Sequence, residues 1–486
     1  MPLLLVLPRQ SLWGAFRLAW LAGVAVNLGL CPWFPQLLSR FAGLHPVLAV
    51  LATLAIAVYQ GLGWALWGVV TRAWSSVVPM ALLAPAAMVV VERGMPMVFP
   101  YSLGLTQYQL LTVAQVGELG GPYVVTFLTI MVGAVVVMVI TARRGAESLP
   151  WGTLAVAGGV LIATAVFGHW RLSGLAEARA EAPTMRVGLV QGAAVQTGWR
   201  ASLEQDGVLL TRYQELSRQL EQRGEPLDLL LWSEKAYPLL LRHDAAHDYQ
   251  EGSPRRIRRG FDSPLVFGVT SVDVASRDIH NSAAFLDRGG RLSVSYDKVR
   301  LIFFSEWLPD IMAGWFSGKR YQPGTRLQPL VVPLAEQAER PARQVPITVF
   351  ICFEAIFPDH VRKLMSHQPE LLINLSDDSW FGDSLEPEQH LAHAVFRAIE
   401  SRRDLVRAAG SGISAFITAS GELQQRGELN EPGRPFFRLL ADDVRLLRQP
   451  SLYATFGDGF CAWCVVVVLV VGVSRLRRKW PPAPQA

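Results

Sequence analysis

The first 170 residues contain very little charge: seven Arg and three Glu, with neither Lys nor Asp. Over all 486 residues 17% are charged and 51% are hydrophobic, whereas an ordinary soluble chain is about 25% charged. This uneven distribution excludes a wholly cytosolic globular protein, a disordered chain and a disulfide-framed secreted module. The formal net charge of +5 requires no nucleic-acid partner, and none is predicted.

Cysteine is scarce as well, with four in the chain: Cys31, Cys352, Cys461 and Cys464. Cys352 is the one cysteine of the charged part, so in an exported domain it cannot form an internal disulfide and is flagged as a free, reactive thiol. Cys461 and Cys464 have CxxC spacing, but they lie in an apolar run, where small buried residues are the better interpretation than a redox pair.

Several familiar motifs are missing. The chain contains no GxSxG elbow, Walker loop or dinucleotide fingerprint, which argues against serine hydrolase and nucleotide chemistry. His390 and His393 are three residues apart on a predicted helix, but no third ligand has matching spacing, so no metal site is predicted. No cofactor is predicted either.

Long apolar runs are present, and runs of about 17 to 25 residues can cross a bilayer as helices. Five predicted spans precede residue 170, and one follows the charged part: Leu12–Leu30, His45–Val70, Val77–Val91, Pro122–Thr141, Trp151–Phe167 and Phe456–Ser474. The stretch Phe99–Gly121 is too polar and too rich in glycine for a span, so it is predicted to be interfacial or re-entrant.

Arginines between the spans predict the orientation, because basic loops stay in the cytoplasm. Arg9, Arg72, the pair Arg143 and Arg144, and the basic end of the chain all fall on one side if the N-terminus is inside and five helices precede residue 170. The predicted organisation is a multi-pass protein of the inner membrane with an N-terminal helical region (1–170), a domain on the periplasmic side (171–455), a last span (456–474) and a basic cytoplasmic tail (475–486).

Residues 185–423 alternate short β-branched runs with helical stretches. The predicted strands include MRVGLVQG, LDLLLWSE, SPLVFGVTSV, SAAFLDRGG, ITVFICFE, ELLINLSDDSW and ISAFITASGEL, and the predicted helices are Ser202–Arg223 and Glu388–Val406. Strands that are apolar throughout belong to sheets covered on both faces. An α/β sandwich (α-β-β-α) attached to an α-helical transmembrane bundle is therefore predicted.

Three strand or loop ends carry groups with useful chemistry: Glu234 after LLLW, Lys298 in YDKVRL and Cys352 after ITVFI. Such a set is coherent, because a thiol can attack a carbonyl, a carboxylate can take its proton, and an ammonium can stabilise thiolate and oxyanion. Taken alone, the three residues favour a packed thiol with two surface charges, because cysteine is among the most buried residue types.

The flanking sequences decide between these interpretations. WSEKAYP, YDKVRLIFFSEWLP, ICFEAIFP and INLSDDSWFGDS closely resemble the nitrilase superfamily. WFGDS followed by QH and RAAGSGIS, FPYSLGLTQY and the apolar flanks resemble its membrane-embedded branch, the bacterial apolipoprotein N-acyltransferases.

This resemblance implies a nucleophile (Cys352), a general base (Glu234) and an oxyanion-stabilising residue (Lys298), with Glu306 and Glu354 as supporting carboxylates. It implies substrate-binding roles near the acyl chain for Trp199 and Phe353, while Trp380 is assigned to a hydrophobic lid because the residues around it indicate an exposed loop. The implied reaction moves an acyl chain from a phospholipid through a cysteine thioester to the amine of a diacylated apolipoprotein. The partners are then these two substrates and membrane lipids, and the enzyme is taken as a monomer.

Several positions depart from the family pattern. Ser233 replaces the usual Pro before the base, Lys235 follows the base where a small polar residue is common, Phe353 replaces Tyr, and Ser411 replaces a frequent Asn. These departures leave two alternatives open: a membrane-anchored amidase or acyl hydrolase of nitrilase type, and a divergent, non-catalytic paralogue that binds lipoproteins.

Overall fold

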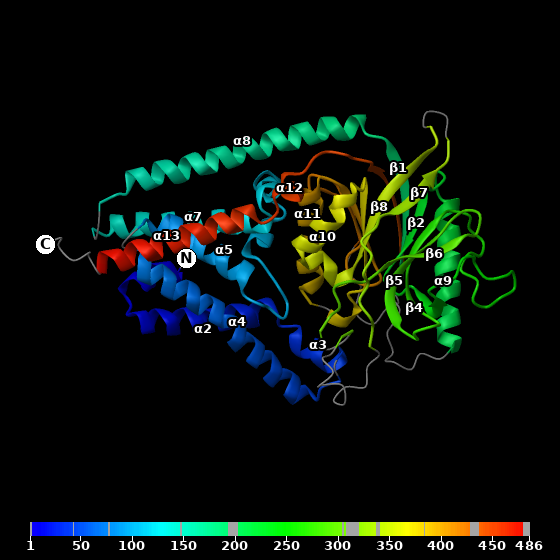
Figure 1. Ribbon diagram of the computed structural model, residues 1–486, viewed down its shortest axis with the longest axis horizontal. Helices are drawn as coiled ribbons and strands as arrows, with labels where there is room; N and C mark the ends of the chain where they lie inside the picture. The colour runs from blue at the N-terminus through cyan, green and yellow to red at the C-terminus, as the bar shows by residue number, and fades with distance from the viewer. Residues whose placement is uncertain are drawn as a thin grey trace. The chain divides into compact units, whose positions relative to one another are not determined.

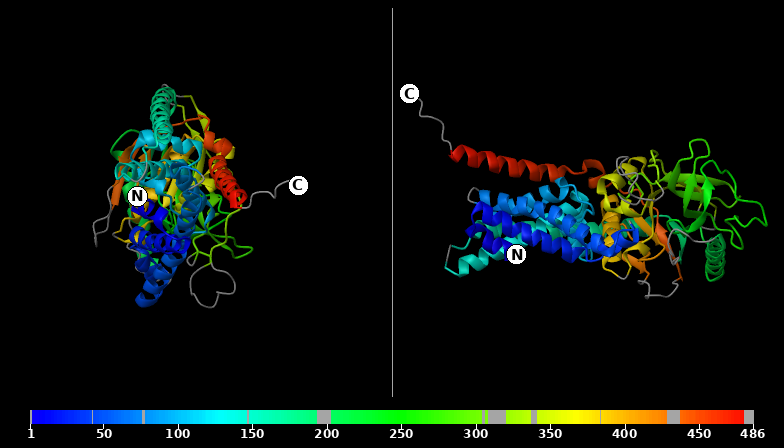
Figure 2. Two further views of the ribbon diagram at one scale, coloured as in Figure 1. Left: turned by 90° about the vertical axis from the view of Figure 1, so that its left-hand side faces the viewer. Right: turned by 90° about the horizontal axis from the view of Figure 1, so that it is seen from below.

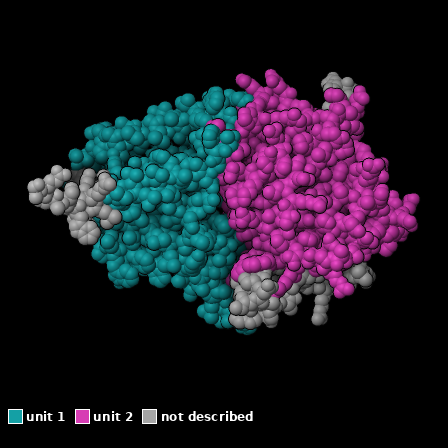
Figure 3. Space-filling view, in the orientation of Figure 1, with its two compact units in different colours: residues 1–35, 45–174, 455–486 teal, residues 36–44, 175–454 magenta. Residues whose placement is uncertain are grey.

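The computed structural model describes residues 2–41, 43–75, 78–145, 148–192, 203–303, 306–307, 320–336, 341–382, 384–427 and 437–479. The chain divides into two compact units (Figure 3). We call residues 1–35, 45–174 and 455–486 the helical unit, and residues 36–44 and 175–454 the sheet unit.

The helical unit consists of apolar helices that pack side by side (Figure 2). Its main helices are α2 (Leu12–Leu30), α4 (Pro46–Trp74), α5 (Met80–Gly94), α7 (Pro122–Arg143), α8 (Trp151–Glu181, which continues into the sheet unit) and α13 (Gly459–Lys479). Within the described residues, four of them, α2, α4, α7 and α8, are long and apolar enough to cross a membrane. These helices fit a membrane protein; the number of crossings stays a prediction.

Helix α5 covers the predicted span Val77–Val91 but has only 15 residues. At ~1.5 Å per residue it is shorter than the ~30 Å hydrocarbon layer. Ten of its residues, from Met80 to Glu92, are nevertheless buried, and it contacts α4, α7 and α13. A helix whose side chains are enclosed by neighbouring helices needs no apolar surface of full membrane length, because those side chains meet protein instead of lipid.

Glu92, near the end of α5, fixes the polar stretch 99–121 by hydrogen bonds. Its carboxylate accepts hydrogen bonds from Ser102 Oγ, the Leu103 amide and Thr126 Oγ1, each at 2.8 Å. A Cβ on Gly104 would lie 2.1 Å from the Pro122 carbonyl oxygen, so only glycine allows this approach. The stretch 99–121 accordingly contains three short helices, η2 (Leu103–Gln107), α6 (Leu111–Ala114) and η3 (Gln115–Leu119).

The sheet unit contains two mixed sheets. Their strand orders are β13-β1-β2-β4-β5-β6, with β3 beside β4, and β12-β11-β10-β9-β8-β7. The strands are β1 (Thr184–Gly192), β2 (Leu229–Trp232), β3 (Tyr237–Arg242), β4 (Leu265–Val272), β5 (Ile279–Leu286), β6 (Leu292–Asp297), β7 (Leu330–Leu334), β8 (Arg343–Ile351), β9 (Leu371–Ser376), β10 (Asp404–Ala409), β11 (Ala415–Ile417), β12 (Leu423–Arg426) and β13 (Phe437–Arg445).

Helices cover the outer faces of both sheets (Figure 1). Helix α9 (Leu203–Gln222) packs on the first sheet, burying Leu210, Tyr213 and Leu220 at helical spacing, whereas α11 (Glu386–Ser401), beside α10 (Pro358–Leu364), covers the second. Strands β2, β9 and β10 are buried along their whole length, as strands between two layers must be. The predicted α-β-β-α sandwich is confirmed.

One predicted boundary differs. The helix expected over Glu388–Val406 ends at Ser401, because Arg402 adopts a left-handed conformation (φ 54°) and the chain turns into β10. Leu405 and Val406 pair with Leu372 and Ile373 of β9. Apolar residues at the end of a helical pattern cannot by themselves distinguish a last helical turn from a buried strand.

Candidate active site

Glu234 lies in a tight turn after β2, in the sheet unit. The Ala236 amide donates to the Ser233 carbonyl at 3.2 Å, and the Gly268 amide of β4 donates to the same oxygen at 3.1 Å. A Cβ on Gly268 would lie 2.5 Å from Glu234 Cα, so glycine lets the turn rest directly on the strand. The Glu234 carboxylate accepts a 2.8 Å hydrogen bond from Asn281 Nδ2 of β5.

Lys298 follows β6 and its side chain is completely buried. Its ammonium lies 2.9 Å from Glu306 Oε2 and 3.5 Å from Glu234 Oε1, and Asn281 also donates to Glu306 at 2.8 Å. Burial alone would lower the pKa of Lys298, but the charges of Glu306 and Glu234 raise it above its usual value. Lys298 therefore carries a permanent positive charge between two carboxylates.

Cys352 is the first residue after β8 and is buried. Its φ of 52° is left-handed, a conformation that costs a non-glycine residue ~1–2 kcal/mol and is found at functional sites. Burial, followed by the charge of Glu234, raises the pKa of its thiol well above the usual value, and the charge of Lys298 opposes this. The thiol is thus protonated at rest, within electrostatic reach of a carboxylate and an ammonium.

Glu354 connects the two loops that carry Lys298 and Cys352. Its carboxylate accepts hydrogen bonds from the amides of Ile351 (2.7 Å), Val299 (2.7 Å) and Arg300 (3.0 Å). Tyr296 adds its hydroxyl at 2.8 Å. Glu354 is therefore a positioning residue, which holds the backbone beside the thiol against the backbone beside the ammonium.

A second network lies behind Cys352 and involves residues that sequence reasoning had assigned no role. His390 Nε2 is 3.1 Å from the Cys352 carbonyl oxygen, and its Nδ1 is 3.0 Å from Asp378 Oδ1. Burial, with the nearby charge of Arg407, lowers the pKa of His390. Arg407 Nη2 in turn lies 3.0 Å from His390 Nδ1 and 2.8 Å from Asp378 Oδ2.

His390 and His393, three residues apart on α11, are both buried. His390 lies close to Asp378 and Glu386: one potential metal-ligand atom from each of the three residues lies within 4.8 Å of the other two. The spacing of these residues along the chain did not indicate this cluster. The guanidinium of Arg407 bonds to both Asp378 and His390 and supplies the positive charge that a metal would otherwise bring. We therefore interpret the cluster as an ion-pair network that fixes the loop of Cys352.

The remaining predicted site residues are placed as follows. Phe353 stacks edge-on against Phe357 with ring centroids 5.0 Å apart, and Trp380, in η7 (Ser379–Phe381), is half-buried whereas its neighbour Phe381 is buried. Trp199 lies outside the described residues. The lid and the acyl-binding roles stay predictions.

Asp377, at the end of β9, is a further carboxyl that sequence reasoning missed. Its oxygens accept from the Ser379 amide (3.0 Å) and from Ser411 Oγ (3.2 Å). Burial and the charge of Glu234 raise its pKa to about 6. Asp377 and Glu234 thus act electrostatically on each other, which only the folded chain reveals because 143 positions of sequence separate them (377 − 234).

Asp377→Asn is expected to raise the melting temperature more at pH 7.5 than at pH 4. Because the folded pKa of about 6 exceeds the unfolded value of ~3.9, folding disfavours the charged form. This penalty is absent below the unfolded pKa, grows as the pH rises and is complete above the folded pKa, reaching at most ~3 kcal/mol. Thermal unfolding of both proteins at the two pH values measures it, and an equal change at both would contradict the assignment.

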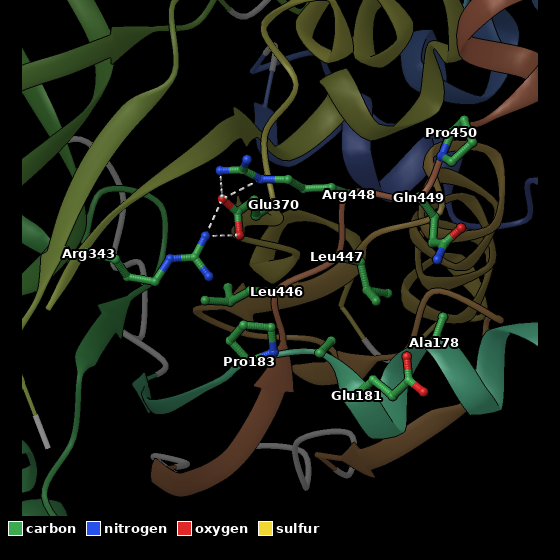
Figure 4. Close-up of a pocket in the computed structure, with 11 residues that line it drawn as sticks. Ala178, Glu181, Pro183, Arg343, Glu370, Leu446, Leu447, Arg448, Gln449 and Pro450 are labelled. Carbon is green, nitrogen blue, oxygen red and sulfur yellow. Dashed lines mark hydrogen bonds and ion pairs between the residues drawn. The ribbon is translucent and has the colours of Figure 1, made fainter. Parts of the chain in front are cut away.

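A separate cleft of 540 Å³ in the sheet unit is lined by none of these residues (Figure 4). Its most polar feature is Glu370, which accepts from Arg343 at 2.6 Å and from Arg448 at 2.7 Å. Because the buried carboxylate already binds both guanidinium groups, we interpret this cleft as a structural junction between the end of α8 and the segment after β13.

Comparison with known proteins agrees with this architecture. The carbon-nitrogen hydrolase family model matches residues 193–433, and the model of the apolipoprotein N-acyltransferase N-terminal domain matches residues 1–135. Among solved structures, a Saccharomyces cerevisiae member of branch 10 of the nitrilase superfamily matches with a TM-score of 0.39 and 13% identity, over 62% of this chain and 96% of that chain. The family model places residues 193–433 in the class of the carbon-nitrogen hydrolases.

The curated relatives narrow this class. The apolipoprotein N-acyltransferase of Geobacter metallireducens is 29% identical over 98% of this chain and 90% of its own length, and that of Bradyrhizobium diazoefficiens is 29% identical over 91% and 81%. Both the N-terminal and the hydrolase-like parts are matched. The chain is thus similar to the apolipoprotein N-acyltransferases in both of its parts.

Proposed function

We propose that this protein transfers a fatty acyl chain from a phospholipid to the α-amine of a diacylglyceryl-cysteine at the N-terminus of an apolipoprotein. The observation that carries the proposal is the buried group of Glu234, Lys298 and Glu306, joined by contacts of 2.9 to 3.5 Å, whose charges act on the strained, buried Cys352. The described residues of the same chain include four apolar helices of spanning length.

In the first half-reaction, Glu234 takes the proton from Cys352 Sγ while the sulfur attacks the ester carbonyl carbon of the donor. The Lys298 ammonium stabilises the oxyanion that forms. As the tetrahedral intermediate collapses, the ester C–O bond breaks, and Glu234 returns the proton to the departing alkoxide of the lysophospholipid. The products are an acyl thioester on Cys352 and a lysophospholipid.

In the second half-reaction, the α-amine of the acceptor attacks the thioester carbon. Glu234 accepts a proton from the amine and Lys298 again stabilises the oxyanion. As the C–S bond breaks, Glu234 passes this proton to the departing sulfur, which releases the amide and regenerates the thiol of Cys352. Water that reached the thioester would hydrolyse it and turn the enzyme into a phospholipase, so access to the buried thiol must be restricted.

We further propose that the sheet unit faces the periplasm of the bacterial inner membrane. Arg9 precedes α2, Arg72 lies in the last turn of α4, Arg143 ends α7, and Arg475 lies near the end of α13. All of these ends fall on the cytoplasmic side if α2, α4, α5, α7, α8 and α13 each cross, in agreement with the retention of basic residues in the cytoplasm.

Mass spectrometry of the full-length protein in phospholipid nanodiscs tests the chemistry. We expect the mass of one acyl chain on the peptide that contains Cys352, and its loss when a synthetic diacylated lipopeptide is added, with the chain recovered as an amide on the lipopeptide. Release of free fatty acid without transfer would instead identify an acyl hydrolase. The absence of any adduct would favour a non-catalytic lipoprotein-binding role.

A further inference from the structure

Lys235 is a second cation beside the proposed catalytic group, and the mechanism above does not use it. We propose that Lys235 binds the phosphate of the acyl donor and so makes the first half-reaction selective for phosphate-bearing lipids. This inference rests on the proposed acyl transfer from phospholipid and assigns to one residue the recognition of the donor's headgroup.

The backbone holds Lys235 firmly. It follows Glu234 directly in the turn that rests on Gly268, and its φ of 54° is left-handed. A Cβ on Gly268 would lie 2.5 Å from the Lys235 amide nitrogen, so the turn cannot move toward β4. The side chain of Lys235 therefore starts from a fixed point beside the general base.

The two lysines differ in accessibility. The side chain of Lys298 is 0% exposed, whereas that of Lys235 is 30% exposed. Lys298 donates a hydrogen bond to Glu306 at 3.0 Å, but Lys235 approaches the same carboxylate only to 3.9 Å. The ammonium of Lys298 is thus enclosed and hydrogen-bonded within the site, whereas the side chain of Lys235 is partly accessible at its surface.

The ammonium of Lys235 also has unused donors. In the described part of the chain it forms no hydrogen bond; its contacts are the ion pair with Glu306 and the ring of Tyr321, whose centroid is 4.9 Å away. Burial would lower the pKa of Lys235, but Tyr321, Glu306 and Glu234 raise it, so the group stays charged. Three N–H donors on a charged, partly exposed ammonium are available to an incoming anion.

The charges of the site favour an anion of this kind. Lys298 and Lys235 offset the charges of Glu234 and Glu306, and of these two ammonium groups Lys235 is the one that an incoming negative charge meets at the surface of the site. In a glycerophospholipid only the glycerol carbons separate the ester under attack from the phosphate, so a donor bound at Cys352 carries its phosphate to the immediate surroundings of the site. Lysine binds phosphate well as a point charge, and the acceptor's amine offers no comparable group.

The test compares two acyl donors that differ in the phosphate. Thioester formation on Cys352 is followed by mass spectrometry over time, at subsaturating phosphatidylglycerol and, separately, at subsaturating diacylglycerol, both in the same neutral detergent. We expect Lys235→Gln to slow the reaction with phosphatidylglycerol about tenfold or more, as the loss of a charge-assisted contact of ~1.5–3 kcal/mol requires, and to leave the reaction with diacylglycerol within about twofold. Lys235→Arg should retain most of the preference.

The control variant is Lys363→Gln, which removes an exposed lysine from α10 and should change neither rate. Alkylation of Cys352 and the melting temperature show whether each variant is folded; if Lys235→Gln is not, Lys235→Met takes its place. Equal slowing with both donors would overturn the proposal, because Lys235 would then act on Glu234 or Glu306. Unchanged rates would overturn it too. If the unsubstituted protein forms no thioester with either donor, the proposed function itself fails.

Discussion

Replacement of Cys352 by alanine is expected to abolish acyl transfer from phospholipid to a diacylated lipopeptide, with a loss of at least ~10⁴-fold. Without the sulfur no thioester can form, and the amine of the acceptor would have to attack an unactivated ester directly. Loss of a covalent nucleophile usually costs this much or more, because the other catalytic groups have nothing to act on. The measurement is amide formation on the lipopeptide, followed by mass spectrometry.

Cys464→Ala provides the matched control. Cys464 is also a buried, free thiol, but it lies on α13 in the helical unit, so its removal should leave transfer unchanged. Both variants should melt within a few degrees of the unsubstituted protein, since each removes one small side-chain atom. Transfer that persists in Cys352→Ala would eliminate the thioester mechanism.

Glu234→Gln is expected to lower the turnover of acyl transfer by about 10²- to 10⁴-fold, the usual contribution of general acid–base catalysis. The substitution keeps the shape of the side chain, and the amide oxygen can still accept from Asn281. It removes the carboxylate that, in the proposed mechanism, takes the thiol proton and returns it to the departing alkoxide. Single-turnover rates of thioester formation measure this step directly.

The same variant, Glu234→Gln, should make the thiol of Cys352 easier to ionise although it slows acyl transfer. The negative charge of Glu234 is the second cause, after burial, of the raised pKa of Cys352. Its removal therefore lowers that pKa, and alkylation of Cys352 by iodoacetamide should reach half-maximal rate at a lower pH in Glu234→Gln than in the unsubstituted protein. If the pKa of Cys352 falls while acyl transfer becomes much slower, the loss of activity is due to the missing proton acceptor and not to a damaged structure. An unshifted or upward-shifted alkylation profile would contradict the assignment of Glu234.

The sequence alone identified those candidate catalytic side chains that stand next to the end of a single strand. Glu234 and Cys352 each follow a short apolar run and Lys298 lies in YDKVRL; the structure places the three residues after β2, β8 and β6. Glu306 and Glu354 were named as supporting carboxylates by resemblance alone. Their contacts distinguish them: Glu306 pairs with Lys298, whereas Glu354 binds backbone amides on both sides of the site.

Residues that act through long-range contacts could not be assigned in this way. Asp377, Arg407 and Asn281 look like ordinary polar residues within or beside strands, and nothing in their spacing indicates Glu234 or His390 as a partner. The effect of Lys235 was similarly open, because an adjacent cation either weakens the base or points elsewhere. The structure directs its ammonium toward Glu306 and Tyr321.

The amino-acid sequence by itself determined that this protein has a lipid-compatible helical part and a sandwich of apolar strands, since both follow from where charge is absent and how apolar residues repeat along the chain. The kinds of side chain that follow the strands could be recognised from the sequence for the same reason. Only the tertiary structure decided which of these groups meet, which lysine is enclosed and which is accessible, and how α5 is surrounded by protein. These properties depend on burial and on distances between residues far apart in the chain, and neither is a function of local spacing.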